Sequence, residues 1–387
     1  MIYLDNSATT RQYDEVTDIM IKCMKEDFGN PSSLYLLGVD SEKIIKKARK
    51  QILDAAGVPK DWQVVFTSGG TEADNMAIIG TARALRRQGN RIVTTSVEHP
   101  AVLECCGFLE REGFEVVKVG VDRNCRLNMD EVKSAINDQT ILVTMMHVNN
   151  EAGTIMPVDK VKAIMKEKGA PGYVHCDAVQ SFGKIPLVTG VDMISLSGHK
   201  IHGPKGSGAL LIRNGVNIPA FVMGGGQEKG MRSGTENVAA IAGLGLAAQM
   251  SADSMKKDMA AITEMRERLI DGLSQIGDVT INSVLETGNE ADMCCPTLLN
   301  VTFMKTRGEV LLHTLEQHQI YVSTGSACSS NKKGQSHVLR AMGLKDKEIE
   351  GTLRFSLGRF NTMDDIDFAI KKVTEAVNRF RRLGSFR

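Results

Sequence analysis

The sequence predicts an α/β fold, in which a mostly parallel mixed sheet lies between helices and a smaller α+β domain follows toward the C-terminus. Short apolar segments recur through the middle of the chain, most of them without polar alternation, as in strands buried on both faces. Segments of helical periodicity separate them. This alternation stops near residue 239, where one long helical stretch begins. The 387 residues are enough for two cores, one in each domain.

The individual elements follow from this periodicity and from the turn residues between them. The expected strands cover 64–67, 91–95, 115–119, 141–148, 173–177, 193–197 and 209–212, and the expected intervening helices cover 71–88, 100–112, 130–136 and 158–168. After the long helix at 239–273, the pattern predicts a strand at 298–303 and helices at 308–317 and 364–381. We therefore expect a large domain over 14–255. Residues 1–13 precede its first helix and are expected to join 256–387 in the small domain.

Charge and composition indicate which kinds of partner and which cellular compartment to expect for this chain. The formal net charge of +1 argues against a nucleic-acid coat or a membrane surface, and no apolar run approaches the roughly 20 residues that span a bilayer. The first residues lack a basic stretch followed by an apolar one, so we expect no signal peptide and a cytoplasmic protein. The eight cysteines contain no Cys-x-x-Cys pair, which predicts neither a metal site nor a disulfide framework.

Polar clusters follow five of the expected strands. Ligands of open α/β sheets bind beyond the carboxyl ends of the strands, so clusters at several strand ends indicate one shared site. The clusters lie at 68–72, 98–100, 149–151, 177–180 and 197–200.

The first cluster, Ser-Gly-Gly-Thr at 68–71, favours phosphate binding. Its glycines leave backbone N–H groups open and a helix follows, which is the usual anion site at a helix N-terminus. A helix cap on a tight turn is the simpler structural alternative.

Three further strand-end residues have both a chemical and a structural interpretation. Lys200, at the inner mouth of the sheet, would lose part of its solvation and offer a nucleophilic amine for a Schiff base, although most lysines are solvated surface charges. Asp177 is either a helix cap or the anionic partner of a pyridinium nitrogen. His99 is either a satisfied core histidine or an acid/base group over a cofactor ring, with a pKa near working pH.

Two residues of the C-terminal region also have a functional interpretation. Arg354, between apolar residues, needs an anion or hydrogen bonds; a substrate carboxylate and a structural salt bridge are both consistent with its segment. Cys328 lies among small and polar residues, which predicts a loop where a free thiol invites a functional explanation. The other cysteines lie in apolar or helical contexts and are expected to be structural.

These motifs together resemble the cysteine desulfurases of the NifS/IscS type, which belong to the class V aminotransferases of pyridoxal-phosphate (PLP) fold type I. The resemblance runs nearly end to end, and seven motifs in family order make a chance match very improbable. They lie at 3–10, 29–33, 67–72, 147–151, 197–200, 232–237 and 325–328.

The resemblance implies a role for each matching residue. Lys200 would form the Schiff base with PLP, His99 would stack on the ring, and Cys328 would receive sulfur from L-cysteine as a persulfide while L-alanine leaves. The implied remaining cofactor contacts are Gly70, Thr71, Ser197 and His199 at the phosphate, Asp177 at the pyridine nitrogen, Gln180 at the ring hydroxyl, and Thr235 at the phosphate of the partner subunit in a homodimer. Asn150 and Arg354 would orient the substrate carboxylate.

The identity of the sulfur acceptor is left open. Residues 329–336 lack the proline and the acidic residue that iron–sulfur-assembly members commonly have there, and the chain ends without the long extension that docks their scaffold. An iron–sulfur scaffold and a tRNA-thiolation enzyme are both plausible acceptor proteins.

Three alternatives remain at this stage. One is another class V PLP reaction, such as selenocysteine lysis, transamination or kynurenine cleavage. The second is a non-catalytic scaffold for sulfur transfer, against which the intact Lys200, Asp177, His99 and Cys328 argue. The third is a nucleotide-binding protein, prompted by glycine clusters at 203–206 and 224–226, neither of which continues as Gly-Lys-Ser/Thr.

Overall fold

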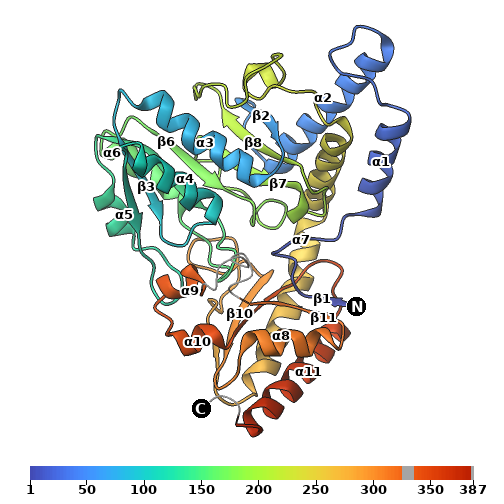
Figure 1. Ribbon diagram of the computed structural model, residues 1–387, viewed down its shortest axis with the longest axis vertical. Helices are drawn as coiled ribbons and strands as arrows, with labels where there is room; N and C mark the ends of the chain where they lie inside the picture. The colour runs from blue at the N-terminus through green and yellow to red at the C-terminus, as the bar shows by residue number, and fades with distance from the viewer. Residues whose placement is uncertain (325–334, 385–387) are drawn as a thin grey trace.

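The computed structural model describes residues 1–324 and 335–384, and its two main sheets lie in separate domains, the larger one uppermost in Figure 1. The large sheet has seven strands in the order β2-β8-β7-β6-β5-β3-β4. Pairing is parallel from β7 to β4 and antiparallel on both sides of β8. The strands are β2 (Trp62–Thr67), β3 (Arg91–Thr95), β4 (Glu115–Val119), β5 (Thr140–Met146), β6 (Tyr173–Asp177), β7 (Met193–Ser197) and β8 (Gly208–Arg213).

Helices cover both faces of this sheet, which is why its strands read as continuous apolar runs. Neighbouring residues Val64 and Val65 of β2 belong to different cores, as expected when successive side chains point to opposite faces. One core is closed by α3 (Gly70–Leu85) and α4 (Pro100–Arg111). The opposite core is closed by α2 (Leu36–Ala56), α5 (Met129–Ala135), α6 (Val161–Glu167) and the first half of α7 (Val238–Ser274).

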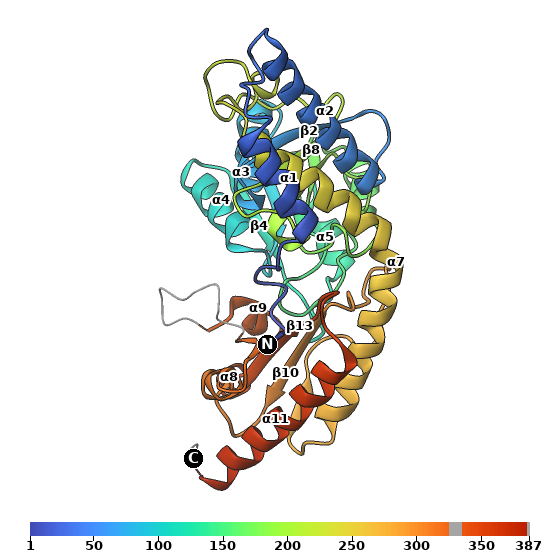
Figure 2. The same cartoon turned by 90° about the vertical axis from the view of Figure 1, so that its right-hand side faces the viewer.

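The long helix α7 runs beside both sheets, and its second half enters the core of the small domain (Figure 2). There a four-stranded antiparallel sheet has the order β12-β13-β10-β9. Its strands are β9 (Val279–Ile281), β10 (Leu298–Phe303), β12 (Ser323–Thr324) and β13 (Thr352–Ser356). Helices α8 (Gly308–Glu316) and α11 (Met363–Arg382) pack in its core, whereas α9 (His337–Ala341) and α10 (Asp346–Glu350) bury side chains against the core of the large domain.

The N-terminal segment joins the two domains. Strand β1 (Ile2–Tyr3) pairs in parallel with β11 (Ile320–Tyr321), and Leu4 is buried in the small-domain core. Farther along, Thr10 donates its backbone N–H to the carbonyl oxygen of His199 in the large domain, at 2.9 Å. Helix α1 (Asp14–Lys25) then packs against α7. This path brings residues 5–10 close to the ends of β6 and β7.

The predicted strands and helices of the large domain are confirmed, with bounds that differ by a few residues. The strand expected at 141–148 ends at Met146, because Asn149 closes a tight turn through its side-chain oxygen. No bounds were predicted for helices α1, α2, α9 and α10 or for strands β1, β9, β11, β12 and β13. The proposed domain boundary at 255/256 falls inside α7, which is continuous there, so that boundary stays a prediction.

Candidate active site

A cavity of about 280 Å³ lies where the carboxyl ends of the parallel strands meet the N-terminal segment and β13. All predicted site residues except Thr235 and Cys328 line it. They are Gly70, Thr71, His99, Asn150, Asp177, Gln180, Ser197, His199, Lys200 and Arg354. The expectation of one shared site at the strand ends is therefore met, and the N-terminal residues Ser7 and Ala8 complete the wall.

Lys200 ends a short 3-10 turn, Gly198–Lys200, that directly follows β7. Its Nζ donates to the backbone carbonyl oxygens of Ser7 and Ala8, the latter at 2.9 Å. The amine is thus held inside the cavity by the N-terminal segment and does not extend into bulk water. A half-buried primary amine at this position is the group that a carbonyl compound would meet on entering.

An anion cradle faces Lys200 at the N-terminus of α3. Gly70 and Thr71 begin that helix, whose first N–H groups have no partners within the helix and favour negative charge. A Cβ on Gly70 would come within 2.7 Å of the Val179 side chain, so the close approach requires glycine. His199 also lines the cavity, and its Nδ1 lies 3.2 Å from Thr9 Oγ1.

Asp177 supplies the anionic group of the cavity. Its Oδ1 accepts the backbone N–H of Val179 at 2.9 Å, which fixes the carboxylate at the end of β6. Burial raises its pKa to about 6, against the opposing effects of the Val179 hydrogen bond and the Lys200 charge. A cationic ring nitrogen placed against this carboxylate would favour its ionised form.

His99 caps the N-terminus of α4, where its Nδ1 accepts the backbone N–H of Ala101 at 3.2 Å. The neutral ring therefore carries its hydrogen on Nε2. Burial, together with the charges of Lys200 and His337, lowers the pKa of His99 to about 4. The expectation of a pKa near working pH is wrong for this state, because burial and the two neighbouring positive charges all disfavour the imidazolium.

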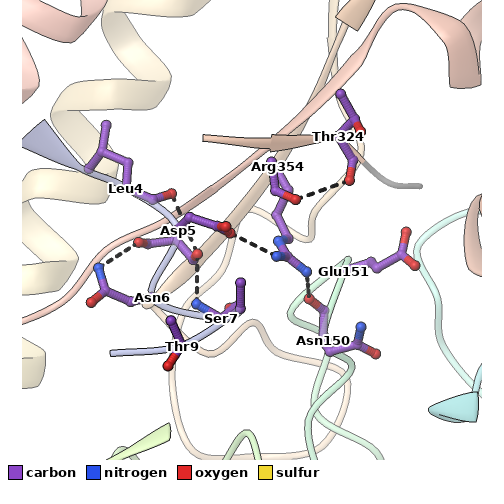
Figure 3. Close-up of polar contacts among 12 residues, drawn as sticks. Leu4, Asp5, Asn6, Ser7, Thr9, Asn150, Glu151, Thr324 and Arg354 are labelled. Atoms are coloured by element: carbon purple, nitrogen blue, oxygen red, sulfur yellow. Dashed lines mark hydrogen bonds and ion pairs between the residues drawn. The ribbon is translucent and has the colours of Figure 1, made fainter. Parts of the chain in front are cut away.

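Arg354 makes the structural salt bridge that was one of its two alternatives, together with a hydrogen bond to a backbone oxygen, and its contact with a substrate carboxylate stays a prediction. Its Nη2 donates to Asp5 Oδ1 at 2.9 Å, and Nη1 donates to the backbone oxygen of Asn150 at 2.9 Å (Figure 3). The buried Nε of Arg354 and the Oδ1 of Asn150 have no hydrogen-bond partner. The salt bridge with Asp5 thus fixes the guanidinium while leaving unsatisfied groups at the cavity.

Sequence reasoning missed three buried carboxyl groups around this site. Asp74 lines the cavity itself, Glu98 precedes His99, and Glu151 follows Asn150. Burial raises the pKa of Glu98 to about 8 and of Glu151 to about 7, and raises that of Asp74 well above its usual range. Their position beside quoted motif residues was the available signal, but burial depth is not visible in a sequence.

Replacing Glu98 with Gln is expected to flatten the pH dependence of stability. Glu98 Oε1 accepts from Thr95 Oγ1 and Met146 N, whereas Oε2 lies unpartnered, so the folded protein holds a proton there up to about pH 8. In the unfolded chain that proton leaves near pH 4.3, so the free energy of unfolding falls as pH rises between about 4.3 and 8. Urea unfolding at pH 6 and pH 8.5 measures this slope.

The exposed Glu309→Gln variant serves as the matched control and should keep the wild-type slope. A Glu98→Gln protein whose stability falls as steeply as the wild type's over this range would contradict the assignment.

The donor set of the cavity fits PLP. The α3 N-terminus suits its phosphate, Lys200 its aldehyde, and Asp177 its pyridine nitrogen. Buried polar atoms without a hydrogen-bond partner are the kind that a polar ligand satisfies; among the residues of this cavity they include Ser7 Oγ, Asn150 Oδ1 and Arg354 Nε. Within residues 1–324 and 335–384, no His, Cys, Asp and Glu cluster could hold a metal ion.

Two predicted site residues are not in this cavity. Thr235 lines a separate cavity of about 310 Å³ with Ser68, Arg232 and Glu236. Cys328 lies outside the described residues. The seven described cysteines are all buried, as expected for structural thiols.

Comparison with known proteins places the chain in a family. It matches the aminotransferase class-V family over residues 2–368. It is 44% identical to the cysteine desulfurase IscS of Methanosarcina thermophila, over 99% of this chain and 93% of that protein. A solved structure of a NifS-like protein has 37% identity and a TM-score of 0.90, covering 98% of this chain and 99% of the other. A structure of SspA in complex with cysteine has 33% identity and a TM-score of 0.78, covering 94% and 100%.

These matches confirm the resemblance to cysteine desulfurases and the expected α/β architecture of PLP fold type I. The matching family depends on PLP, in agreement with the donor set of the cavity. This chain is therefore a member of the aminotransferase class-V family.

Proposed function

We propose that this chain is a PLP-dependent cysteine desulfurase, which converts L-cysteine to L-alanine and forms a persulfide on Cys328. The observation that carries the proposal is the shared cavity in which Lys200, Asp177 and the α3 N-terminus surround one space of cofactor size. Full-length relatives named cysteine desulfurase, at 40–44% identity, support the choice of this reaction over other class V reactions.

The residues that line the cavity would each have a separate role in binding the cofactor or in moving a proton. Lys200 would hold PLP through a Schiff base and, once released, move the proton at the substrate Cα. Gly70, Thr71, Ser197 and His199 would bind the phosphate, Gln180 would contact the ring hydroxyl, and His99 would cover the ring as a neutral imidazole. When bound, PLP withdraws electrons from the substrate Cα, and Asp177 strengthens this by pairing with the ring nitrogen.

The sulfur step is balanced without a further oxidant. The C–S bond of cysteine breaks while a bond forms between its sulfur and the Cys328 sulfur. The carbon skeleton keeps the electron pair, takes up a proton and leaves as alanine. A thiol reductant or an acceptor protein then removes the terminal sulfur from Cys328.

Incubation with sulfur-labelled cysteine tests the proposal. We expect equal amounts of alanine and transferred sulfur. Alkylation followed by mass spectrometry should place the label on the peptide that contains Cys328. Formation of pyruvate and ammonia from cysteine, with no label on the protein, would instead indicate a simple lyase.

Arg354→Lys is expected to raise KM for cysteine by about tenfold or more with a much smaller change in kcat. Lysine keeps the charge but has no planar fork to serve Asp5, the Asn150 carbonyl oxygen and a substrate carboxylate together. Loss of one charge-assisted hydrogen bond corresponds to about 1.5–3 kcal/mol. Steady-state kinetics of alanine formation measure the effect.

Arg359→Lys is the matched control, since Arg359 contacts Tyr13 and Ser254 outside this cavity. Equal KM values for the Arg354→Lys and wild-type proteins would show that Arg354 serves only the Asp5 salt bridge.

A homodimer forms part of the proposal, with Thr235 reaching the phosphate in the partner's site. Thr235 lines a cavity apart from Lys200 within one chain, which fits a role across an interface. Apolar side chains near the start of α2 are exposed to solvent in one chain: Leu34 is 98% exposed and Leu36 79% exposed. A partner subunit that packs against them would remove this apolar surface from water. Sedimentation of the purified protein measures the oligomeric state.

The acceptor is proposed to be a protein, either an iron–sulfur scaffold or a tRNA-thiolation enzyme. Transfer of labelled sulfur from the loaded enzyme to each purified candidate distinguishes them. No helix in residues 1–324 and 335–384 has both the length and the apolar character to cross a membrane. We propose a cytoplasmic location, which fractionation of cells would test.

A further inference from the structure

Lys184 is a buried lysine that lies behind Gln180, a residue that lines the active-site cavity. Its side chain is only 9% exposed, and its Nζ donates to Gln180 Oε1 at 3.1 Å. The other end of the same carboxamide, Gln180 Nε2, donates to the backbone oxygen of Ser7 at 3.0 Å. Gln180 lines the cavity of Lys200, and Lys184 lines a small adjoining cavity. A chain of contacts therefore leads from a buried charge to the active site.

Stabilisation of the fold does not explain this lysine. In the described part of the chain, Lys184 has no carboxylate partner. An ammonium buried without a counter-ion is unfavourable, and burial lowers the pKa of Lys184 to about 8. Apolar residues of similar volume often replace buried charges without loss of stability. A reason outside the free energy of folding is needed for a charge at this position.

The chemistry of the contact supplies that reason. An ammonium group donates hydrogen bonds and cannot accept them, so the group of Gln180 that faces Lys184 must be its oxygen. The carbonyl oxygen of Ser7 only accepts, so the group that faces it must be the NH2. A carboxamide turned the other way would place donor against donor and acceptor against acceptor. The two contacts together fix one orientation of Gln180.

We propose that Lys184 is a positioning residue, which holds the Gln180 carboxamide with its NH2 group toward the cavity so that it donates to the cofactor's ring hydroxyl oxygen. This inference rests on the proposed cofactor site. A fixed donor and a nearby positive charge both favour the deprotonated form of that oxygen.

Several other charged or titratable groups surround Lys184. Arg354 and Cys295 affect it directly, and Lys200, His202, Asp258 and Arg359 share the adjoining cavity. Asp258 is engaged by Ser254 and by Arg359, at 2.7 and 3.6 Å. The charge of Lys184 therefore stays largely uncompensated on the side of Gln180.

A pH titration of the visible absorption of the PLP-loaded protein tests the inference. Lys184→Met removes the donor and the charge, and the absorption midpoint is expected to rise by about one pH unit. Gln180→Ala and the variant that carries both Lys184→Met and Gln180→Ala complete a double-mutant cycle. If Lys184 acts through Gln180, Lys184→Met should shift the midpoint in the Gln180→Ala background by less than half as much. Lys184→Gln, which keeps a neutral donor, should give a midpoint between those of wild type and Lys184→Met, and it substitutes if the Met variant fails to fold.

The outcomes separate this inference from the function on which it rests. A wild-type protein that takes up no PLP overturns the proposed function and this inference with it. A wild-type titration that Lys184→Met leaves unchanged overturns the inference alone, as does a shift of equal size with and without Gln180. Lys205→Met, at an exposed lysine, is the control and should titrate as the wild type does.

Discussion

Lys200→Ala is expected to lower alanine formation from cysteine by at least about 10³-fold and to abolish borohydride labelling at position 200. The substitution removes both the amine that would hold PLP and the group that would move the proton at Cα. General acid–base catalysis alone contributes about 10²–10⁴-fold. The loss should appear mainly in kcat, because Arg354 and Asn150 still offer their groups to the substrate carboxylate.

Steady-state kinetics and peptide mapping after reduction check this result. Lys205→Ala is the matched control, an exposed lysine five positions farther along the chain, and it should keep wild-type kinetics. The Lys200→Ala protein should still bind PLP noncovalently through the α3 N-terminus and Asp177, more weakly than the wild type does. A variant with wild-type turnover would refute the assignment of Lys200, as would a wild-type protein in which borohydride fixes PLP to a different residue.

Cys328→Ala is expected to abolish sulfur transfer from cysteine while leaving cofactor binding intact. The thiol is the proposed acceptor in the step that breaks the C–S bond, and alanine offers no nucleophile there. Sulfide release in the presence of a reductant should fall by at least about 10³-fold. The visible absorption of bound PLP should match that of the wild type, since none of the residues that line the cavity has changed.

The matched control is Cys23→Ala, at a buried thiol of α1. It should release sulfide at the wild-type rate, apart from any loss of folded protein that thermal unfolding would show. Sulfide release by Cys328→Ala at the wild-type rate would remove the persulfide mechanism, and a class V lyase reaction would take its place.

Much of the fold followed from periodicity. The mostly apolar run of β5 indicates a strand covered on both faces, and the shorter segments of β6 and β7 follow it in parallel order in the structure. Strand β13 escaped prediction because Arg354 interrupts its apolar run. Helices α1 and α2 mix apolar with charged residues, and the contacts with α7 that bury one side of each are not local in sequence.

The site was only partly accessible to the same reasoning. Lys200 and Asp177 stood out because each lies at the carboxyl end of an expected strand, and parallel strands bring these ends together. Asp5 did not stand out, because its salt bridge with Arg354 spans 349 residues of sequence. The neutral state of His99 likewise depends on burial and on neighbouring charges that the sequence does not place.

The sequence by itself determined the αβ order, the strand-end clusters and the resemblance that names the reaction. Local patterning and residue chemistry suffice for these. Only the tertiary structure decided which cations and carboxylates are dehydrated, which of them meet across the domain boundary, and that Lys184 faces Gln180. Desolvation and contact depend on distances through space, and a chain sets those distances only when its domains pack against each other.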